Sequence, residues 1–210
     1  MLSTLKRMLP SAIRQSFKNS LDFCQWRARD YGAPSPGSIK QRVLLRNAAP
    51  SCAWVETGTY LGDTAAFLAR HSSRVFTIEP APAIYELASR RLARLRNVEV
   101  INGASEDVFP NLLPQLSGAV SFWLDGHYSG GTTWVTYQGS AKTPIVEELA
   151  QIELHRARFS ALNVLIDDIR CFEAAEAESG YPQLDYLVDW ARRNGMRWHI
   201  EHDIFVARRL

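Results

Sequence analysis

The stretch from Ala53 to Gly62 changes its hydrophobic period in mid-course and has the residue types of a ligand-binding turn. Apolar residues run up to Glu56, Gly58 and Gly62 bracket a short segment, and helical spacing resumes after it. This order predicts a strand, a glycine-rich turn and a helix. In an open α/β sheet, such a first crossover lies beside a nucleotide-like ligand, against the helix N-terminus. A tight turn without a ligand has the same pattern, so both interpretations stay open.

The side chains of this turn indicate which ligand it could take. Dinucleotide-binding turns have glycine at the first, third and sixth positions, but counting from Gly58 the third and sixth residues are Tyr60 and Asp63. Tyr60 would block a pyrophosphate, and Asp63 would repel it. A ligand without phosphates and with a positive centre fits better. Glu79 ends the next predicted strand about 20 residues later, where a carboxylate can accept both hydroxyls of a ribose.

Strand-like and helix-like patterns alternate from residue 52 onwards, which predicts the elements that position these residues. After the strand that ends at Glu56, further strands are expected at 74–79, 97–102, 119–125, 162–167, 196–201 and 204–208. Helices are expected at 82–96, from Ser105, at 144–158 and near 183–193. The last two strands are too close for a crossover, so they must form an antiparallel hairpin. The predicted fold class is α/β, a doubly wound and mostly parallel sheet with one antiparallel strand.

Composition sets the broad class of the protein. A chain of 210 residues with 46% apolar and 22% charged residues is typical of one globular domain with a sizeable core. No run approaches the roughly 20 apolar residues that span a bilayer, and the first residues lack the pattern of a secretory signal. Cys24, Cys52 and Cys171 are widely separated, which is typical of reduced thiols. We therefore expect a cytoplasmic protein without a transmembrane segment.

The chain divides by charge into a basic N-terminal arm, residues 1–49, and a domain at 50–210. The arm holds nine Lys and Arg against two acids, while residues 101–210 hold nine against fifteen. Apolar residues at three- and four-residue steps predict amphipathic helices over 2–29, and Ser38 and Gln41 have the spacing of a capping box for a helix that ends near Pro50. The arm could contact an anionic membrane surface, a nucleic acid or a second subunit, or it could be a solvated helix face.

Residues 50–210 resemble the class I S-adenosylmethionine-dependent methyltransferases. The matching features are residues 56–62 in the first motif, Glu79 after the second strand, residues 103–106 after the third, and the terminal strand hairpin. The resemblance implies a Rossmann-like, seven-stranded sheet of order 3-2-1-4-5-7-6 with the seventh strand antiparallel. It also implies S-adenosyl-L-methionine as cofactor, with a binding site formed by Glu56, Gly58, Thr59, Tyr60, Gly62, Glu79, Ser105 and Asp125.

A second group of residues resembles the divalent-metal-dependent O-methyltransferases of the macrolide-sugar and catechol types. Asp125 follows the fourth strand, Asp167 and Asp168 follow the fifth, and in that family these strand ends are neighbours. The resemblance implies a Mg²⁺ site at the three carboxylates and places Asp125 among the catalytic residues. Tyr128 replaces the lysine of the catechol pattern, so His127 is the better candidate for the general base. Alternatively, Asp125 binds the donor's amino group without metal, Asp167 and Asp168 cap a helix, and His127 is a loop residue.

The function predicted from these features is methyl transfer to a hydroxyl of a small molecule, either a sugar or a phenol-like acceptor. Trp134 and Tyr137, in the long segment after His127, offer flat apolar surfaces to such an acceptor. Two alternatives remain, namely a nucleic-acid or protein methyltransferase that uses the arm, and an inert methyltransferase-like binding module. Two features argue against a nucleic-acid substrate. Residues 101–210 carry a net negative charge, and no Asn/Asp-Pro-Pro-aromatic motif or Pro-Cys nucleophile follows the fourth strand. The arm leaves a homo-oligomer or a membrane-surface contact open.

Overall fold

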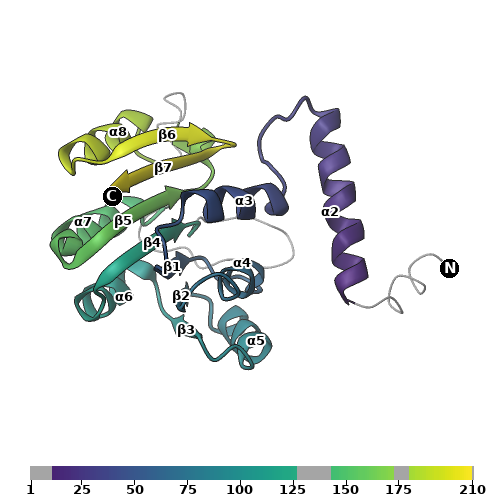
Figure 1. Cartoon of the computed structure of the whole chain (residues 1–210), viewed down its shortest axis with the longest axis horizontal. Helices are drawn as coiled ribbons and strands as arrows, with labels where there is room; N and C mark the ends of the chain where they lie inside the picture. The colour runs from purple at the N-terminus through teal and green to yellow at the C-terminus, as the bar shows by residue number, and fades with distance from the viewer. Residues whose placement is uncertain (1–10, 127–142, 173–179, 210) are drawn as a thin grey trace.

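The computed structural model describes residues 11–126, 143–172 and 180–209 and contains one seven-stranded sheet (Figure 1). Its strand order is β3-β2-β1-β4-β5-β7-β6, and only β7 runs antiparallel to its neighbours β5 and β6. The strands are β1 (Ala53–Thr57), β2 (Arg74–Glu79), β3 (Val98–Asn102), β4 (Gly118–Leu124), β5 (Phe159–Ile166), β6 (Arg197–Glu201) and β7 (Ile204–Arg209). This order and the antiparallel terminal hairpin confirm the predicted fold class.

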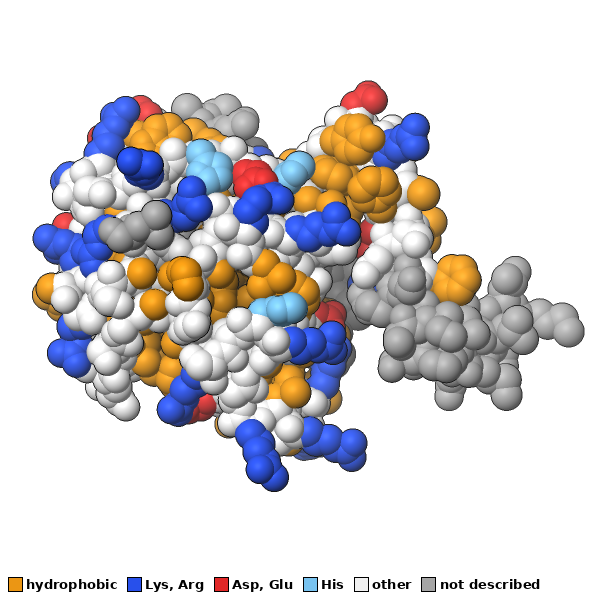
Figure 2. All heavy atoms as spheres, in the orientation of Figure 1, with side chains coloured by type: hydrophobic (Ala, Val, Ile, Leu, Met, Phe, Trp, Pro, Cys, Tyr) orange, Lys and Arg blue, Asp and Glu red, His pale blue; other side chains and the backbone are white. Residues whose placement is uncertain are grey.

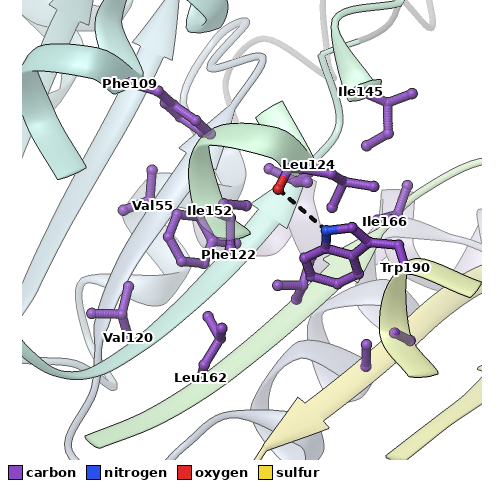
Figure 3. Close-up of a cluster of buried hydrophobic side chains, with 14 of the residues drawn as sticks. Val55, Phe109, Val120, Phe122, Leu124, Ile145, Ile152, Leu162, Ile166 and Trp190 are labelled. Carbon is purple, nitrogen blue, oxygen red and sulfur yellow. Dashed lines mark hydrogen bonds between the residues drawn. The ribbon is translucent and has the colours of Figure 1, made fainter. Parts of the chain in front are cut away.

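Helices cover both faces of the sheet, which gives the doubly wound arrangement. One core cluster packs α3 (Gly37–Asn47), α4 (Asp63–Leu68) and α5 (Pro82–Leu92) against one face. The other packs α6 (Ser105–Leu112), α7 (Ile145–His155) and α8 (Leu184–Arg193) against the opposite face. Figure 3 shows part of this second cluster, in which the Trp190 indole N–H donates to the Leu149 carbonyl at 3.2 Å. The ends of the strands are thereby held on a rigid, two-sided scaffold.

The central strands are buried on both faces, and this explains their continuous apolar runs. Residues 54–57 of β1, 75–79 of β2 and 120–124 of β4 are all buried, whereas only alternate or scattered residues of the edge strands β3 and β6 are even partly buried. Polar residues at the carboxyl ends of the central strands are therefore placed in a largely water-excluded setting. Glu56 and Glu79 are two such residues, and each is at most 3% exposed.

One predicted helix cap and one predicted helix end were wrong. The predicted capping box at Ser38 and Gln41 is absent, because α3 begins at Gly37 after Pro36 and has no side-chain cap. Helix α5 ends at Leu92 rather than at residue 96. The Asn97 side chain donates to the carbonyls of Ala69 and Ser72, at 2.8 and 3.1 Å, and thereby helps to hold the turn that leads into β3.

The arm consists of two helices with different surroundings. Helix α2 (Ser11–Ala28) stands to one side of the sheet, whereas α3 lies against it (Figure 1). Val43 and Leu44 of α3 are completely buried beside Trp54 of β1. The residues predicted as an arm thus include one helix that belongs to the core. None of the described helices is both long enough and apolar enough to cross a bilayer.

Candidate functional site

The turn after β1 is built around Gly58. Its φ of 83° favours glycine, and its N–H and that of Thr59 both donate to the Ile78 carbonyl of β2, at 3.0 and 3.1 Å. A Cβ atom at Gly58 would lie only 2.6 Å from the Asp125 carbonyl oxygen after β4. The turn therefore packs directly on the segment that carries Asp125. Gly62, with φ 77°, precedes α4 and leaves no room for a side chain beside Leu92.

Glu79 is fixed at the end of β2, next to this turn. Its Oε2 accepts the Tyr60 N–H at 2.8 Å, and its Oε1 accepts the Ala81 N–H at 3.0 Å. Burial raises the pKa of Glu79, and these two hydrogen bonds act in the opposite direction. A carboxylate has about four acceptor positions, so two remain for the hydroxyls of a ligand. Tyr60 itself is 48% exposed, and its backbone, rather than its side chain, holds Glu79.

Glu56 of β1 and Thr59 of the turn that follows are linked through Thr77 of β2. The Thr77 hydroxyl donates to Glu56 Oε2 at 2.6 Å and lies 2.6 Å from the Thr59 hydroxyl. Burial raises the pKa of Glu56 to about 8, and nearby Glu79 adds to this effect. Glu56 is 1% exposed, and its carboxyl stabilises the turn through the Thr77 hydroxyl. Direct contact between Glu56 and a ligand stays a prediction.

The acidic residues after β4 and β5 come together as the resemblance implied. Leu124 and Ile166 are paired in register, so Asp125 and Asp167 follow them side by side, and the Asp167 N–H donates to the Leu124 carbonyl at 3.0 Å. The pKa of Asp125 is raised well above its ordinary value, first because the carboxyl is desolvated and then because Asp167 is near. Asp168 has a φ of 54°, and its N–H donates to Asp167 Oδ1 at 2.8 Å.

Lys40 of α3 reaches this acidic group, which sequence reasoning did not foresee. Its Nζ donates to Asp167 Oδ2 and, at 3.4 Å, to Asp168 Oδ1. Burial alone would lower the pKa of Lys40, but Asp167, Asp125 and Asp168 outweigh it and raise the pKa, so the ammonium stays charged. Arg170 also donates to Asp168 Oδ1, at 2.8 Å, and pairs with Asp203.

The predicted Mg²⁺ site at Asp125, Asp167 and Asp168 is not supported by this arrangement. An ammonium contacts two of the three carboxylates, at the place where a metal would have to bind. Among residues 11–126, 143–172 and 180–209, no group of three or more His, Cys, Asp or Glu side chains is arranged to hold a metal ion. The residues as they lie therefore do not fit a divalent ion.

Ser105 and Glu148 lie close to each other and to Thr57, the last residue of β1. Ser105 begins α6, is 6% exposed, and its hydroxyl lies 3.5 Å from Glu106 Oε2. Glu148 in the first turn of α7 is 1% exposed, and burial raises its pKa to about 7, although the nearby hydroxyls of Ser105 and Thr57 act to lower it. Within the described part of the chain, Glu148 Oε1 and Thr57 Oγ1 have no partner that meets hydrogen-bond geometry.

Lys40 and Glu148 were missed because their positions depend on tertiary packing. Lys40 lies in the predicted arm, and Glu148 sits beside Glu147 in a helix with an ordinary amphipathic pattern. Sequence spacing carries no signal that either side chain faces the strand ends. His127, Trp134 and Tyr137 lie outside the described residues, so the general base and the acceptor surface stay predictions.

Comparison with known proteins rests on structure alone. No protein-family model matches the sequence, and the curated proteins give no match either. Solved structures do match. An O-methyltransferase from Bacillus cereus in complex with SAH (S-adenosylhomocysteine) has a TM-score of 0.55 and 17% identity, covering 90% of this chain and 88% of its own.

This chain has the fold of the class I S-adenosylmethionine-dependent methyltransferases. A Staphylococcus aureus protein proposed to be a caffeoyl-CoA O-methyltransferase matches with a TM-score of 0.56 and 14% identity, covering 95% of this chain and 96% of its own. A Clostridium thermocellum protein proposed to be an rRNA methylase matches at 0.51 and 10%, covering 81% and 94%. Identities this low establish the methyltransferase fold and leave the acceptor open.

Proposed function

We propose that the chain is an S-adenosylmethionine-dependent methyltransferase that acts on a hydroxyl group of a small molecule. The observation that carries this proposal is Glu79, a buried carboxyl fixed by two backbone N–H groups beside the glycine turn. Its two remaining acceptor positions suit the hydroxyls of a ribose. Gly58, Thr59 and Gly62 bring the backbone of the turn to the same edge of the sheet, where the methionine part of the donor would lie.

The acidic end of β4 and β5 supports a donor with a positive centre. When bound, S-adenosylmethionine supplies an electrophilic methyl group on a sulfonium. The backbone of Asp125 packs against Gly58, and we propose that the Asp125 carboxylate faces the positively charged part of the donor. Ser105, at the start of α6, would flank the adenine in this proposal. No step of this proposal uses a metal ion, because the carboxylates do not fit one as they lie.

The chain's own contribution to the chemistry is to orient the acceptor and to remove its proton. Methyl transfer to oxygen needs the hydroxyl in line with the methyl group, and positioning is a large part of the rate enhancement. His127, two residues after Asp125, is the residue we assign to proton removal, since a neutral imidazole can accept a proton near neutral pH. The acceptor oxygen gains the methyl group, its proton passes to His127, and S-adenosylhomocysteine leaves.

A methyl-transfer screen tests the proposal. The full chain is incubated with donor labelled in the methyl group, and glycans, phenols and structured RNA are offered as separate acceptors. We expect label in a hydroxyl of a sugar or phenol. Label in RNA would instead favour the alternative in which the basic arm binds nucleic acid, and no transfer to any acceptor by protein that binds the donor would favour an inert module.

Replacing His127 tests the proposed base. His127→Gln keeps hydrogen bonding but cannot take a proton at neutral pH, so turnover should fall by about 10²–10⁴-fold with donor affinity nearly unchanged. His155→Gln is the matched control, because His155 lies on α7 and its Nδ1 is hydrogen-bonded to the Gln151 carbonyl oxygen of the same helix at 2.9 Å. Turnover of His127→Gln close to that of the control would remove the base from the proposal and indicate an acidic acceptor hydroxyl.

A further inference from the structure

Lys40 joins the predicted arm to the acidic residues that follow β5. Its ammonium donates to Asp167 and Asp168, and its side chain is 20% exposed, whereas that of Asp167 is 1% exposed. The cation is thus largely withdrawn from water and lies against a carboxylate that is wholly withdrawn. An ammonium has three donors and no acceptor, so a second cation cannot use it as a ligand.

The backbone that carries Lys40 is firmly held. The Lys40 N–H donates to the Pro36 carbonyl at 3.1 Å, and Val43 and Leu44, on the same helix, are completely buried against the sheet. At the other end of α3, the Asn47 carbonyl accepts from the Asn163 amide of β5 at 2.7 Å. The helix is therefore tied to the same strand that ends at Asp167, and the lysine starts from a fixed point.

The charges around the acidic group are already balanced in part by the chain itself. Asp167 is paired with Lys40, and Asp168 is shared between Lys40 and Arg170. A divalent ion placed at these carboxylates would lie next to the ammonium, and two cations at that separation repel strongly where water is excluded. Binding a metal would require Lys40 to leave a site where it meets two carboxylates.

We propose that Lys40 supplies the fixed cation of this site in place of a divalent metal ion. The ammonium neutralises Asp167 and Asp168 and ties α3 to the carboxyl end of β5. Metal binding at these carboxylates is thereby excluded, and methyl transfer proceeds without an added ion. Only the last consequence rests on the proposed function, since the occupancy of the site by Lys40 can be measured without any turnover.

Manganese titration followed by electron paramagnetic resonance tests this proposal, because the signal of free Mn²⁺ is lost on binding. The full chain, stripped of metal with a chelator, is compared with Lys40→Met, which keeps the length of the side chain and removes its charge. We expect the wild type to bind no Mn²⁺ over the range of the titration. Lys40→Met should bind Mn²⁺ within that range, with an affinity at least about tenfold above the upper limit for the wild type. Lys40→Arg, which keeps the charge, and Lys18→Met, on the exposed surface of α2, should both behave as the wild type.

Two results would overturn the proposal. One is stoichiometric Mn²⁺ binding by the wild type that Asp167→Asn abolishes, because the ammonium would then be no barrier to a metal. The other is no Mn²⁺ binding in a folded Lys40→Met, because removal of the cation would have uncovered no site. If circular dichroism shows Lys40→Met to be unfolded, Lys40→Gln takes its place, and the wild-type titration can overturn the proposal by itself.

The donor is tested separately, so that the two proposals can fail independently. Calorimetry with S-adenosylmethionine on the wild type reports on the proposed function, whatever the manganese titration gives. A protein that binds neither the donor nor Mn²⁺ would contradict the proposed function and leave the assignment of Lys40 standing. For an active enzyme, methyl transfer should be unchanged by EDTA.

Discussion

At the scale of single residues, Glu56 and Glu148 are buried carboxyls whose charged forms are disfavoured in the folded chain. Burial is the main cause for both, and it raises the pKa of Glu56 to about 8 and that of Glu148 to about 7, from an ordinary value of 4.5. The Thr77 hydrogen bond to Glu56 acts in the opposite direction but is outweighed. At a pH between 4.5 and about 7, both carboxyls are therefore largely protonated, whereas an exposed glutamate is largely charged.

This has a consequence for stability, with a definite sign. Each group holds its proton more tightly when folded, so its contribution is full below pH 4.5 and is lost as the pH rises towards 7 or 8. Each can lower the free energy of unfolding by up to about 1.4 kcal/mol per pH unit within that window. Urea unfolding of Glu56→Gln should show a flatter pH profile than the wild type.

The matched control for this measurement is Glu86→Gln. Glu86 is exposed on α5, where its side chain is 62% exposed and pairs with Arg90. Its profile should run parallel to that of the wild type. A Glu56→Gln profile that is also parallel would mean that Glu56 ionises normally in the folded chain, and that its burial does not control its charge.

At the scale of elements, the turn between β1 and α4 depends on space that only a glycine leaves. Gly58 and Gly118 have similar φ angles, 83° and 79°. A Cβ at Gly58 would meet the Asp125 backbone, whereas one at Gly118 would meet nothing within 4 Å. Gly58→Ala should therefore lower the free energy of unfolding by about 1–3 kcal/mol more than Gly118→Ala does. Thermal or urea unfolding measures the difference, and equal losses would show that the contact with Asp125 relaxes without cost.

The elements also show how far the sequence could predict the structure. Strand positions were predictable because β1, β2 and β4 are buried on both faces and read as continuous apolar runs. Helix ends were less predictable, because the turn after α5 is held by Asn97, whose partners Ala69 and Ser72 lie in the segment after α4. Gly58 and Glu79 could be found by local spacing. Lys40 could not, because its role depends on α3 packing against β5.

At the scale of the whole molecule, the basic arm divides into a helix that belongs to the core and one that does not. Helix α2 carries exposed hydrophobic side chains, with Phe17 67% and Leu21 56% exposed (Figure 2). At its end, Trp26 is 4% exposed and packs edge-on against His202 in the turn between β6 and β7. A second subunit or a membrane surface as the partner of α2 stays a prediction, as does the cytoplasmic location.

The candidate site lies at the carboxyl ends of the four central strands of the sheet, beside the glycine turn and the buried acidic residues. β1 and β4 are neighbours in the centre of the sheet, with β2 and β5 on either side of them. Their carboxyl ends therefore bring together Gly58, Glu79, Asp125 and Asp167, which are far apart in the sequence. We propose that the methyl donor binds at this edge of the sheet.

Calorimetric titration with S-adenosylmethionine tests that claim most directly. We predict one donor molecule bound per chain, and a loss of about 1–3 kcal/mol of binding free energy in Glu79→Ala, because the ligand's hydroxyls would then lack their acceptor. Glu99→Ala is the matched control, since Glu99 lies on the edge strand β3 and pairs with Arg74 at the surface. Binding of NAD without binding of S-adenosylmethionine, or equal affinity in Glu79→Ala and the control, would contradict the account.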